Sequence, residues 1–340
     1  RQDDSQLRGS VRATGTTLVN MSRQMNELVS VVIRTLNEDR YLEELLQAIR
    51  SQECPGLSVE VVLVDSGSTD RTLEIAQEYD CRITHIDKSR FTFGRSLNVG
   101  CNIAAGSILV FISGHCVPCD SNWLKELVSG IYEGCDYVYG RQVGRDTTKF
   151  SERQLFAKYF PEQSKLPQVG FFCNNANSAL RRDSWERFRF NEELPGCEDM
   201  YLARLILEKG GAVGYCADAP VYHIHDENWA SVKKRYEREA YALHRILPEI
   251  SISYLEMLQY IAVGIIKDFK AAIGFGVFWR EASSIVRFRI MQYTGAYKGN
   301  KIQRKVSEVA KTKYFYPRAS EMFVTHRQQD IRHDGEDERQ

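Results

Sequence analysis

The chain has 340 residues, of which 43% are hydrophobic and 26% charged, so it can bury one large core or two modest ones. Its 45 basic residues equal its 45 acidic residues, which argues against a disordered chain and against nucleic acid as a partner. The nine cysteines are an odd number and no signal peptide is visible. We therefore expect a reduced, cytoplasmic setting.

Strands and helices are predicted to alternate along the first part of the chain. Residues 1–27 are polar and aperiodic, which predicts a mobile leader. Apolar, β-branched runs then predict strands at 28–34, 59–65 and 107–113, and amphipathic stretches predict helices at 40–52, 69–79 and 122–132. This alternation indicates an α/β fold with right-handed crossovers and a mainly parallel sheet covered by helices on both faces.

Polar residues collect where two predicted strands end. Thr35, Asn37 and Glu38 follow the first strand, while Asp65 and Ser66 follow the second. We expect the Asp65 carboxylate at a solvent-open strand end, where it can accept hydrogen bonds from a base or ribose. Because Asp, Ser and Gly favour turns in general, an ordinary connection between strand and helix is the alternative interpretation.

A third polar group follows the buried strand at 107–113. Ser113, Gly114 and His115 emerge at its carboxyl end, which is where α/β sheets bind ligands. Downstream, His223 and His225 follow a short predicted strand and alternate by two, and residues two apart on a strand share a face. Imidazole is a metal ligand, but a packed core histidine and two polar loop residues are the alternative.

Six motifs occur together in one order: "VVIRTLNE", "VLVDSGSTDRT", "FGRSLNVGCNIAAGSILVFISGHCVP", "NNANSALRR", "LPGCEDMYLARLI" and "VYHIHD". In this order and spacing the chain resembles the inverting family 2 glycosyltransferases over residues 28–247. It is most similar to bacterial rhamnosyltransferase-type enzymes that build surface polysaccharides. The resemblance implies the A-type nucleotide-sugar transferase fold (GT-A), a Rossmann-like mixed sheet with helices on both faces.

The resemblance also implies a nucleoside-diphosphate sugar as donor and a glycan or a lipid-linked glycan as acceptor. It assigns the general base to Asp199 in "LPGCEDMYLARLI", although acidic residues also favour helix N-termini through the helix dipole. The planar guanidinium group of Arg95 can donate two hydrogen bonds to a phosphate. A surface ion pair is the alternative interpretation of this residue. The donor-binding set is Thr35, Asn37, Glu38, Asp65, Ser66, Arg95, Asn98, Ser113, Gly114 and Glu198.

The metal-binding motif departs from the family pattern. The family's pair of acidic residues one apart falls on Ser113 and His115, so neither is acidic here. We expect a weak divalent cation site that forms with the donor, made by His115 with His223 or His225, and preferring Mn²⁺ to Mg²⁺. Metal-independent transfer, with Arg95 or other basic groups as the counter-charge, is the alternative.

Residues 248–325 are predicted to form a helical, amphipathic extension, followed by a disordered tail at 326–340. The longest uncharged runs, 257–266 and 271–279, are too short to span a membrane. Basic residues interleave with aromatic and aliphatic ones, which suits either a helix at a membrane surface or a homodimer interface. We expect peripheral association with the inner face of the plasma membrane.

Cys116 and Cys119 form a lone C-x-x-C without a second pair at zinc-finger spacing, so a structural role is expected. The sequence as a whole predicts an inverting glycosyltransferase of surface polysaccharide synthesis. A non-catalytic sugar-nucleotide-binding or scaffold protein with a decayed metal site is the alternative that the missing acidic pair favours.

Overall fold

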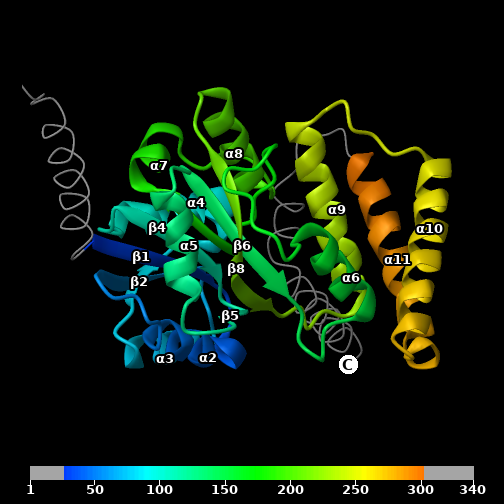
Figure 1. The fold of residues 1–340 in the computed structure, drawn as a ribbon, viewed down its shortest axis with the longest axis horizontal. Helices are drawn as coiled ribbons and strands as arrows, with labels where there is room; N and C mark the ends of the chain where they lie inside the picture. Colours follow the sequence, from blue (N-terminus) through cyan, green and yellow to red (C-terminus); the bar gives the residue numbers. More distant parts are fainter. Residues whose placement is uncertain (1–26, 302–340) are drawn as a thin grey trace, which may run out of the picture.

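The computed structural model describes residues 27–301, in which one eight-stranded sheet is covered by helices on both faces (Figure 1). The strands are β1 (Glu27–Thr35), β2 (Leu57–Asp65), β3 (Arg82–His85), β4 (Ile108–Ser113), β5 (Cys116–Pro118), β6 (Tyr137–Val143), β7 (Asn177–Arg181) and β8 (Val213–His223). Their spatial order is β3-β2-β1-β4-β7-β6-β8-β5. Strands β3, β2, β1 and β4 run parallel, whereas β7 is antiparallel to both β4 and β6. The sheet is therefore mixed.

Ten α-helices and one short 3-10 helix lie within the described residues. They are α2 (Asp39–Arg50), α3 (Thr72–Glu78), η1 (Lys88–Arg90), α4 (Phe93–Ile103), α5 (Trp123–Tyr132), α6 (Phe150–Tyr159), α7 (Arg182–Phe188), α8 (Glu198–Glu208), α9 (Trp229–Ile246), α10 (Tyr254–Gly274) and α11 (Phe278–Asn300). The α/β GT-A fold class and its C-terminal helical extension are confirmed. The six elements predicted between residues 28 and 132 all occur, with ends that shift by up to three residues.

The period of two along β1 explains why the sheet carries a core on each face. Val29, Val31 and Ile33 enter one hydrophobic cluster with residues of α2, α3 and α5. Val32 points the other way, into a second cluster with residues of α4, α7 and α8. A strand buried on both faces is mostly apolar, and the polar residue near the middle of β1, the buried Ser30, has hydrogen-bond partners in Glu60 and the Gly106 N–H.

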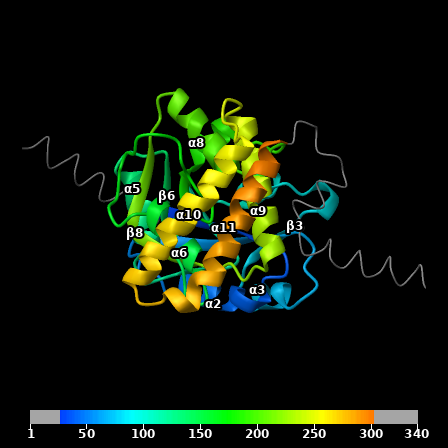
Figure 2. The ribbon, with the colours of Figure 1, turned by 90° about the vertical axis from the view of Figure 1, so that its right-hand side faces the viewer.

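Helix α11 packs against α9, α10 packs against α11, and the two form the outermost layer in Figure 2. Helix α11 lies so close to α9 that a Cβ atom at Gly295 or Gly299 would overlap carbonyl oxygens of α9. Helix α10 is held to α11 by a buried ion pair in which Arg289 donates two 2.7 Å hydrogen bonds to Asp268. The predicted leader and tail lie outside the described residues, and the domain boundary at residue 247 stays a prediction.

Nine cysteines lie in the described residues, and all nine are free. Cys116 is part of the core on the α2 side of the sheet, as a structural role requires. Within residues 27–301, no helix is both long and apolar enough to cross a membrane.

We predict that Asp268→Ala destabilises the protein by about 3–5 kcal/mol, because it leaves the Arg289 guanidinium buried without its carboxylate partner. Both side chains are nearly inaccessible, with exposed fractions of 3% and 6%. Denaturant unfolding is the measurement, with Gln259→Ala on the exposed side of the same helix as control. A loss no larger than that of the control would contradict the structural role of the pair.

Candidate functional site

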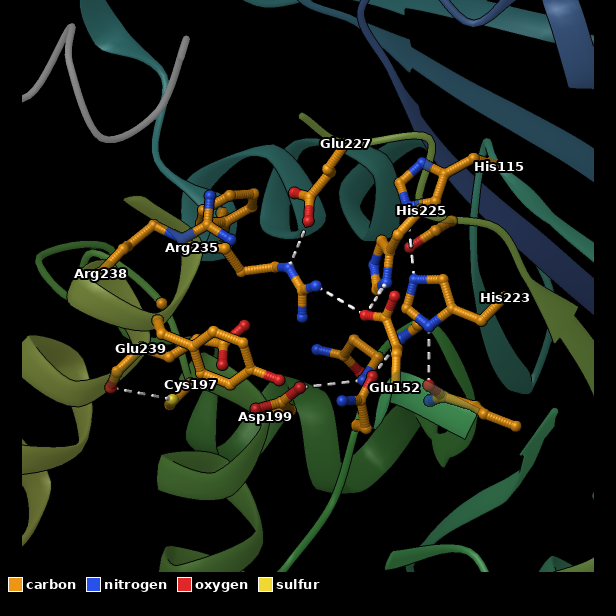
Figure 3. Close-up of a pocket in the computed structure, with 18 of the residues that line it drawn as sticks. His115, Glu152, Cys197, Asp199, His223, His225, Glu227, Arg235, Arg238 and Glu239 are labelled. Atoms are coloured by element: carbon orange, nitrogen blue, oxygen red, sulfur yellow. Dashed lines mark hydrogen bonds and ion pairs between the residues drawn. The ribbon is translucent and has the colours of Figure 1, made fainter. Parts of the chain in front are cut away.

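A cavity of about 1090 Å³ opens at the carboxyl ends of β1 and β4. Helices α6, α8, α9 and α11 supply its other walls, so the C-terminal extension completes it. Figure 3 shows its charged interior, where side chains from the sheet edge and from these helices point toward one another. The predicted site residues that line it are Thr35, Asn37, Glu38, Ser66, Ser113, Gly114, His115, Glu198, Asp199, His223 and His225.

Asn37 links the two turns that follow β1 and β2. Its backbone adopts a left-handed conformation with φ of 56°, which asparagine tolerates better than most residues. Its side-chain oxygen accepts a 2.8 Å hydrogen bond from the backbone N–H of Thr69, and its own N–H donates to the Ser68 hydroxyl at 2.9 Å. These bonds give the cavity a rigid edge.

The expectation that Asp65 sits at a solvent-open strand end is wrong. The residue is fully buried, because the turn after β2 folds back over its carboxylate. That carboxylate accepts hydrogen bonds from the backbone N–H groups of Gly67 at 2.8 Å and Ser68 at 3.0 Å. Asp65 is absent from the cavity lining, whereas its neighbour Ser66 lines the cavity. Asp65 therefore shapes the turn that carries Ser66.

The structure does not bring Arg95 and Asn98 to the cavity. Arg95 donates from Nε to Glu192 at 2.7 Å, which is the surface ion pair that the sequence left as its alternative. The Asn98 side chain is buried, donates to the carbonyl of Phe190 and accepts from the Trp185 indole. Its hydrogen bonds hold the chain before α8 against α4, so its role is structural in this arrangement.

Asp199 lies in the first turn of α8, facing the cavity, and is only 9% exposed. Its carboxylate accepts hydrogen bonds from the backbone N–H groups of Asn175 at 2.9 Å and Met200 at 2.7 Å. Burial, followed by the neighbouring carboxylate of Glu198, nevertheless raises the pKa of Asp199 to about 7. Glu198 itself is paired with Arg34 at 3.4 Å. A carboxyl with such a pKa can accept a proton near neutral pH.

The three predicted histidines form one cluster. One ring nitrogen of each of His115, His223 and His225 lies within 4.8 Å of those of the other two, and the Nε2 atoms of His115 and His223 are 3.3 Å apart. Burial and the two neighbouring imidazoles lower the pKa of His223 well below its usual range. Three imidazoles at this spacing could hold one divalent transition ion.

Sequence reasoning missed Glu152 of α6, which is 2% exposed and lines the cavity. Its Oε1 accepts from His225 Nδ1 at 2.8 Å and from Arg235 at 2.6 Å. Burial alone would raise the pKa of Glu152, but these two partners lower it to about 2. The signal available in the sequence was the spacing of Glu152 and Phe156, which are four residues apart and so share one face of a helix. That face is the buried one.

Four arginines also line the cavity without having been predicted: Arg34, Arg40, Arg235 and Arg238. The guanidinium groups of Arg34 and Arg238 each lie 4.9 Å from the centre of the Phe93 ring. Both groups are placed near the Glu198 and Asp199 end of the cavity, since Arg34 pairs with Glu198. They bring positive charge to a site where the predicted Arg95 brings none.

The opposite part of the cavity wall is apolar. Its side chains come from α6, from the segment before β7, from the end of α9 and the loop after it, and from α10 and α11: Leu155, Phe156, Tyr159, Phe160, Phe172, Leu243, Ile250, Ile252, Tyr260, Tyr293 and Ala296. A cavity with a charged end and an apolar wall suits a substrate that has both characters.

Comparison with known proteins agrees with these features. A sequence model described as "Glycosyl transferase family 2" matches residues 30–188. The O-antigen chain rhamnosyltransferase RfbN of Salmonella typhimurium is 28% identical over 225 residues, which cover 61% of this chain and 70% of that enzyme. The poly(ribitol-phosphate) beta-N-acetylglucosaminyltransferase TarS of Staphylococcus aureus is 32% identical over 245 residues, covering 70% of this chain but only 40% of that protein.

Among solved structures, the mannosyltransferase PcManGT from Pyrobaculum calidifontis, in complex with GDP-Man and Mn²⁺, matches with a TM-score of 0.52. The match covers 91% of this chain and 97% of that one at 17% identity, so it shows a shared fold alone. Over residues 30–188 this chain is therefore similar to glycosyl transferase family 2, and its relatives include an O-antigen chain rhamnosyltransferase.

Proposed function

We propose that the cavity binds a nucleoside-diphosphate sugar and transfers the sugar, with inversion, to a hydroxyl group of a glycan or lipid-linked acceptor in surface polysaccharide synthesis. The observation that carries this proposal is the Asp199 carboxyl, which faces the cavity and has a pKa of about 7. An inverting transfer requires one base on the acceptor side of the anomeric carbon.

In the proposed reaction Asp199 takes the proton from the acceptor hydroxyl as its oxygen attacks the anomeric carbon. The bond from that carbon to the diphosphate oxygen breaks, and the diphosphate leaves with the electron pair. The new proton stays on the Asp199 carboxyl. Backbone N–H groups of Asn175 and Met200 hold this carboxylate in position, so that it does not have to reorganise during the reaction.

The leaving diphosphate needs positive charge beside it. A divalent cation at the histidine cluster would supply that charge when bound, and Arg34, Arg235 and Arg238 supply it from the chain itself. We propose Mn²⁺ in preference to Mg²⁺, because imidazole is a poorer ligand for the harder ion. The non-catalytic alternative rests on the missing acidic pair, and the three clustered histidines at that place argue against a decayed site.

Helix α10 offers the surface on which we propose that the enzyme meets a membrane. Leu255, Ile266 and Ile273 fall on one helical face and are 76%, 54% and 63% exposed. Lys267 and Lys270 beside them are exposed as well, which favours an anionic lipid surface over a second copy of the chain. The apolar wall of the cavity includes Tyr260 of the same helix, so a lipid-linked acceptor on that surface would lie close to the site. We place the enzyme in the cytoplasm at the inner face of the plasma membrane.

Donor binding is the first testable consequence. We predict that one activated sugar stabilises the protein against thermal unfolding, by about 2.7 kcal/mol at 100 times its dissociation constant. The names of the relatives give the first donors to test, activated rhamnose and activated N-acetylglucosamine. Absence of stabilisation by any nucleoside diphosphate or its sugar conjugates would contradict a donor site in the cavity.

Asp199→Asn is expected to keep donor affinity near that of the wild type and to reduce transfer by a factor of about 10²–10⁴, the usual contribution of a positioned base. The measurement combines calorimetry with the donor and a transfer assay with its acceptor. Asp183→Asn is the matched control, because Asp183 is an exposed acid in the first turn of α7. Equal transfer by the two variants would show that Asp199 only stabilises its helix.

We further predict that the protein floats with anionic liposomes at low salt and less so as salt rises, because salt screens the attraction of lysine for anionic lipid. Ile266→Ser combined with Ile273→Ser should abolish flotation. Val169→Ser, which changes an exposed apolar residue outside α10, should leave it intact. Concentration-dependent dimerisation without flotation would identify α10 as a subunit interface instead.

A further inference from the structure

The hydrogen bonds around the histidine cluster fix which nitrogen of each ring is protonated. His115 Nδ1 faces Glu38 Oε1 at 3.2 Å, His223 Nδ1 faces Gln142 Oε1 at 2.7 Å, and His225 Nδ1 faces Glu152 Oε1 at 2.8 Å. Carboxylate and amide oxygens only accept hydrogen bonds. Each Nδ1 therefore carries the hydrogen, and each Nε2 of a neutral ring carries a lone pair.

Two of these lone pairs, those of His115 and His223, lie close together. The Nε2 atoms of His115 and His223 lie 3.3 Å apart, and two lone pairs at that distance make no hydrogen bond. Two nitrogens that bind one tetrahedral zinc ion at about 2.0–2.1 Å are themselves separated by about 3.3 Å. The observed spacing is therefore that of a site prepared for a cation.

The residues that hold two of these rings are themselves buried. Glu152 Oε2 and Gln142 Nε2 are buried without a hydrogen-bond partner in the described part of the chain, although their other side-chain atoms are engaged by the histidines. A buried carboxylate that accepts from a ligating imidazole fixes its tautomer, orients its ring and raises its basicity. Since Arg235 already pairs with the Glu152 carboxylate, the part of Glu152 is to hold the His225 ring.

We propose that His115, His223 and His225 together bind one divalent transition ion through their Nε2 atoms before the donor arrives, and that Glu152 and Gln142 are the positioning residues for two of these rings. This inference rests on the proposed function only in placing the ion where the leaving diphosphate would lie. An all-imidazole set favours zinc, cobalt and other transition ions over Mg²⁺.

The test measures ion binding alone, so its failure is distinguishable from a failure of sugar transfer. The full, tag-free chain, stripped of metal by a chelator, is titrated with Co²⁺ in the absence of nucleotide, and visible absorption reports the coordination. We expect one Co²⁺ per chain, displaced by Zn²⁺ but not by an excess of Mg²⁺. Absence of such a site, equal competition by Mg²⁺, or binding only after a nucleoside diphosphate is added would overturn the proposal.

Variants then assign the ligands and the positioning residues. His115→Ala changes the most exposed of the three rings and should weaken Co²⁺ binding at least about tenfold, while Glu152→Gln should weaken it about 10- to 100-fold. His85→Ala, which removes a histidine whose side chain is 65% exposed outside the cavity, should bind Co²⁺ as the wild type does.

Circular dichroism identifies any variant that fails to fold, and Gln142→Ala provides a second test of positioning if Glu152→Gln is such a variant. Wild-type affinity in His115→Ala would refute the three-histidine site. Wild-type affinity in folded Glu152→Gln or Gln142→Ala would refute the positioning role of that residue.

Discussion

The proposed reaction places one constraint on the cavity: the Asp199 carboxyl must be able to ionise although it is buried. Burial and the neighbouring Glu198 carboxylate destabilise the charged form of Asp199, whereas hydrogen bonds from two backbone N–H groups stabilise it. The backbone N–H of Asn175 is itself held in place, because the side-chain oxygen of Asn175 accepts hydrogen bonds from Tyr137 of β6 and Ser178 of β7. The position of the Asp199 carboxyl is thus set by the centre of the sheet, and its pKa follows from a balance of opposing effects.

The helical extension is part of the site because α11 contributes cavity wall and is packed on α9 too closely for side chains at Gly295 and Gly299. Helix α9 in turn carries Arg235, which binds Glu152 beside the histidines. A movement of the extension would therefore alter both the apolar wall and the charged end. In the proposed reaction such a movement would affect both the acceptor and the donor.

Local patterns in the sequence were sufficient for the six elements between residues 28 and 132, since β-branched runs and amphipathic stretches depend on neighbours in the chain. Roles that depend on distant partners were less accessible. Arg95 meets Glu192, 97 residues away, and Glu152 meets His225, 73 residues away, so neither contact is visible in a motif. Asp65 shows a third case, because the same "DSG" letters describe an open turn and one that closes over its own carboxylate. The histidines were found because two of them share one strand end and the third replaces an expected acid.

The central claim, that Asp199 is a base poised for neutral pH, is tested most directly by its own titration. Carboxyl ¹³C NMR of protein labelled at aspartate, with Asp199→Asn used to assign the signal, gives the pKa without any substrate. We predict a midpoint near 7, with the carboxyl protonated below it and ionised above it. A midpoint near 4, the ordinary value for aspartate, would contradict the account.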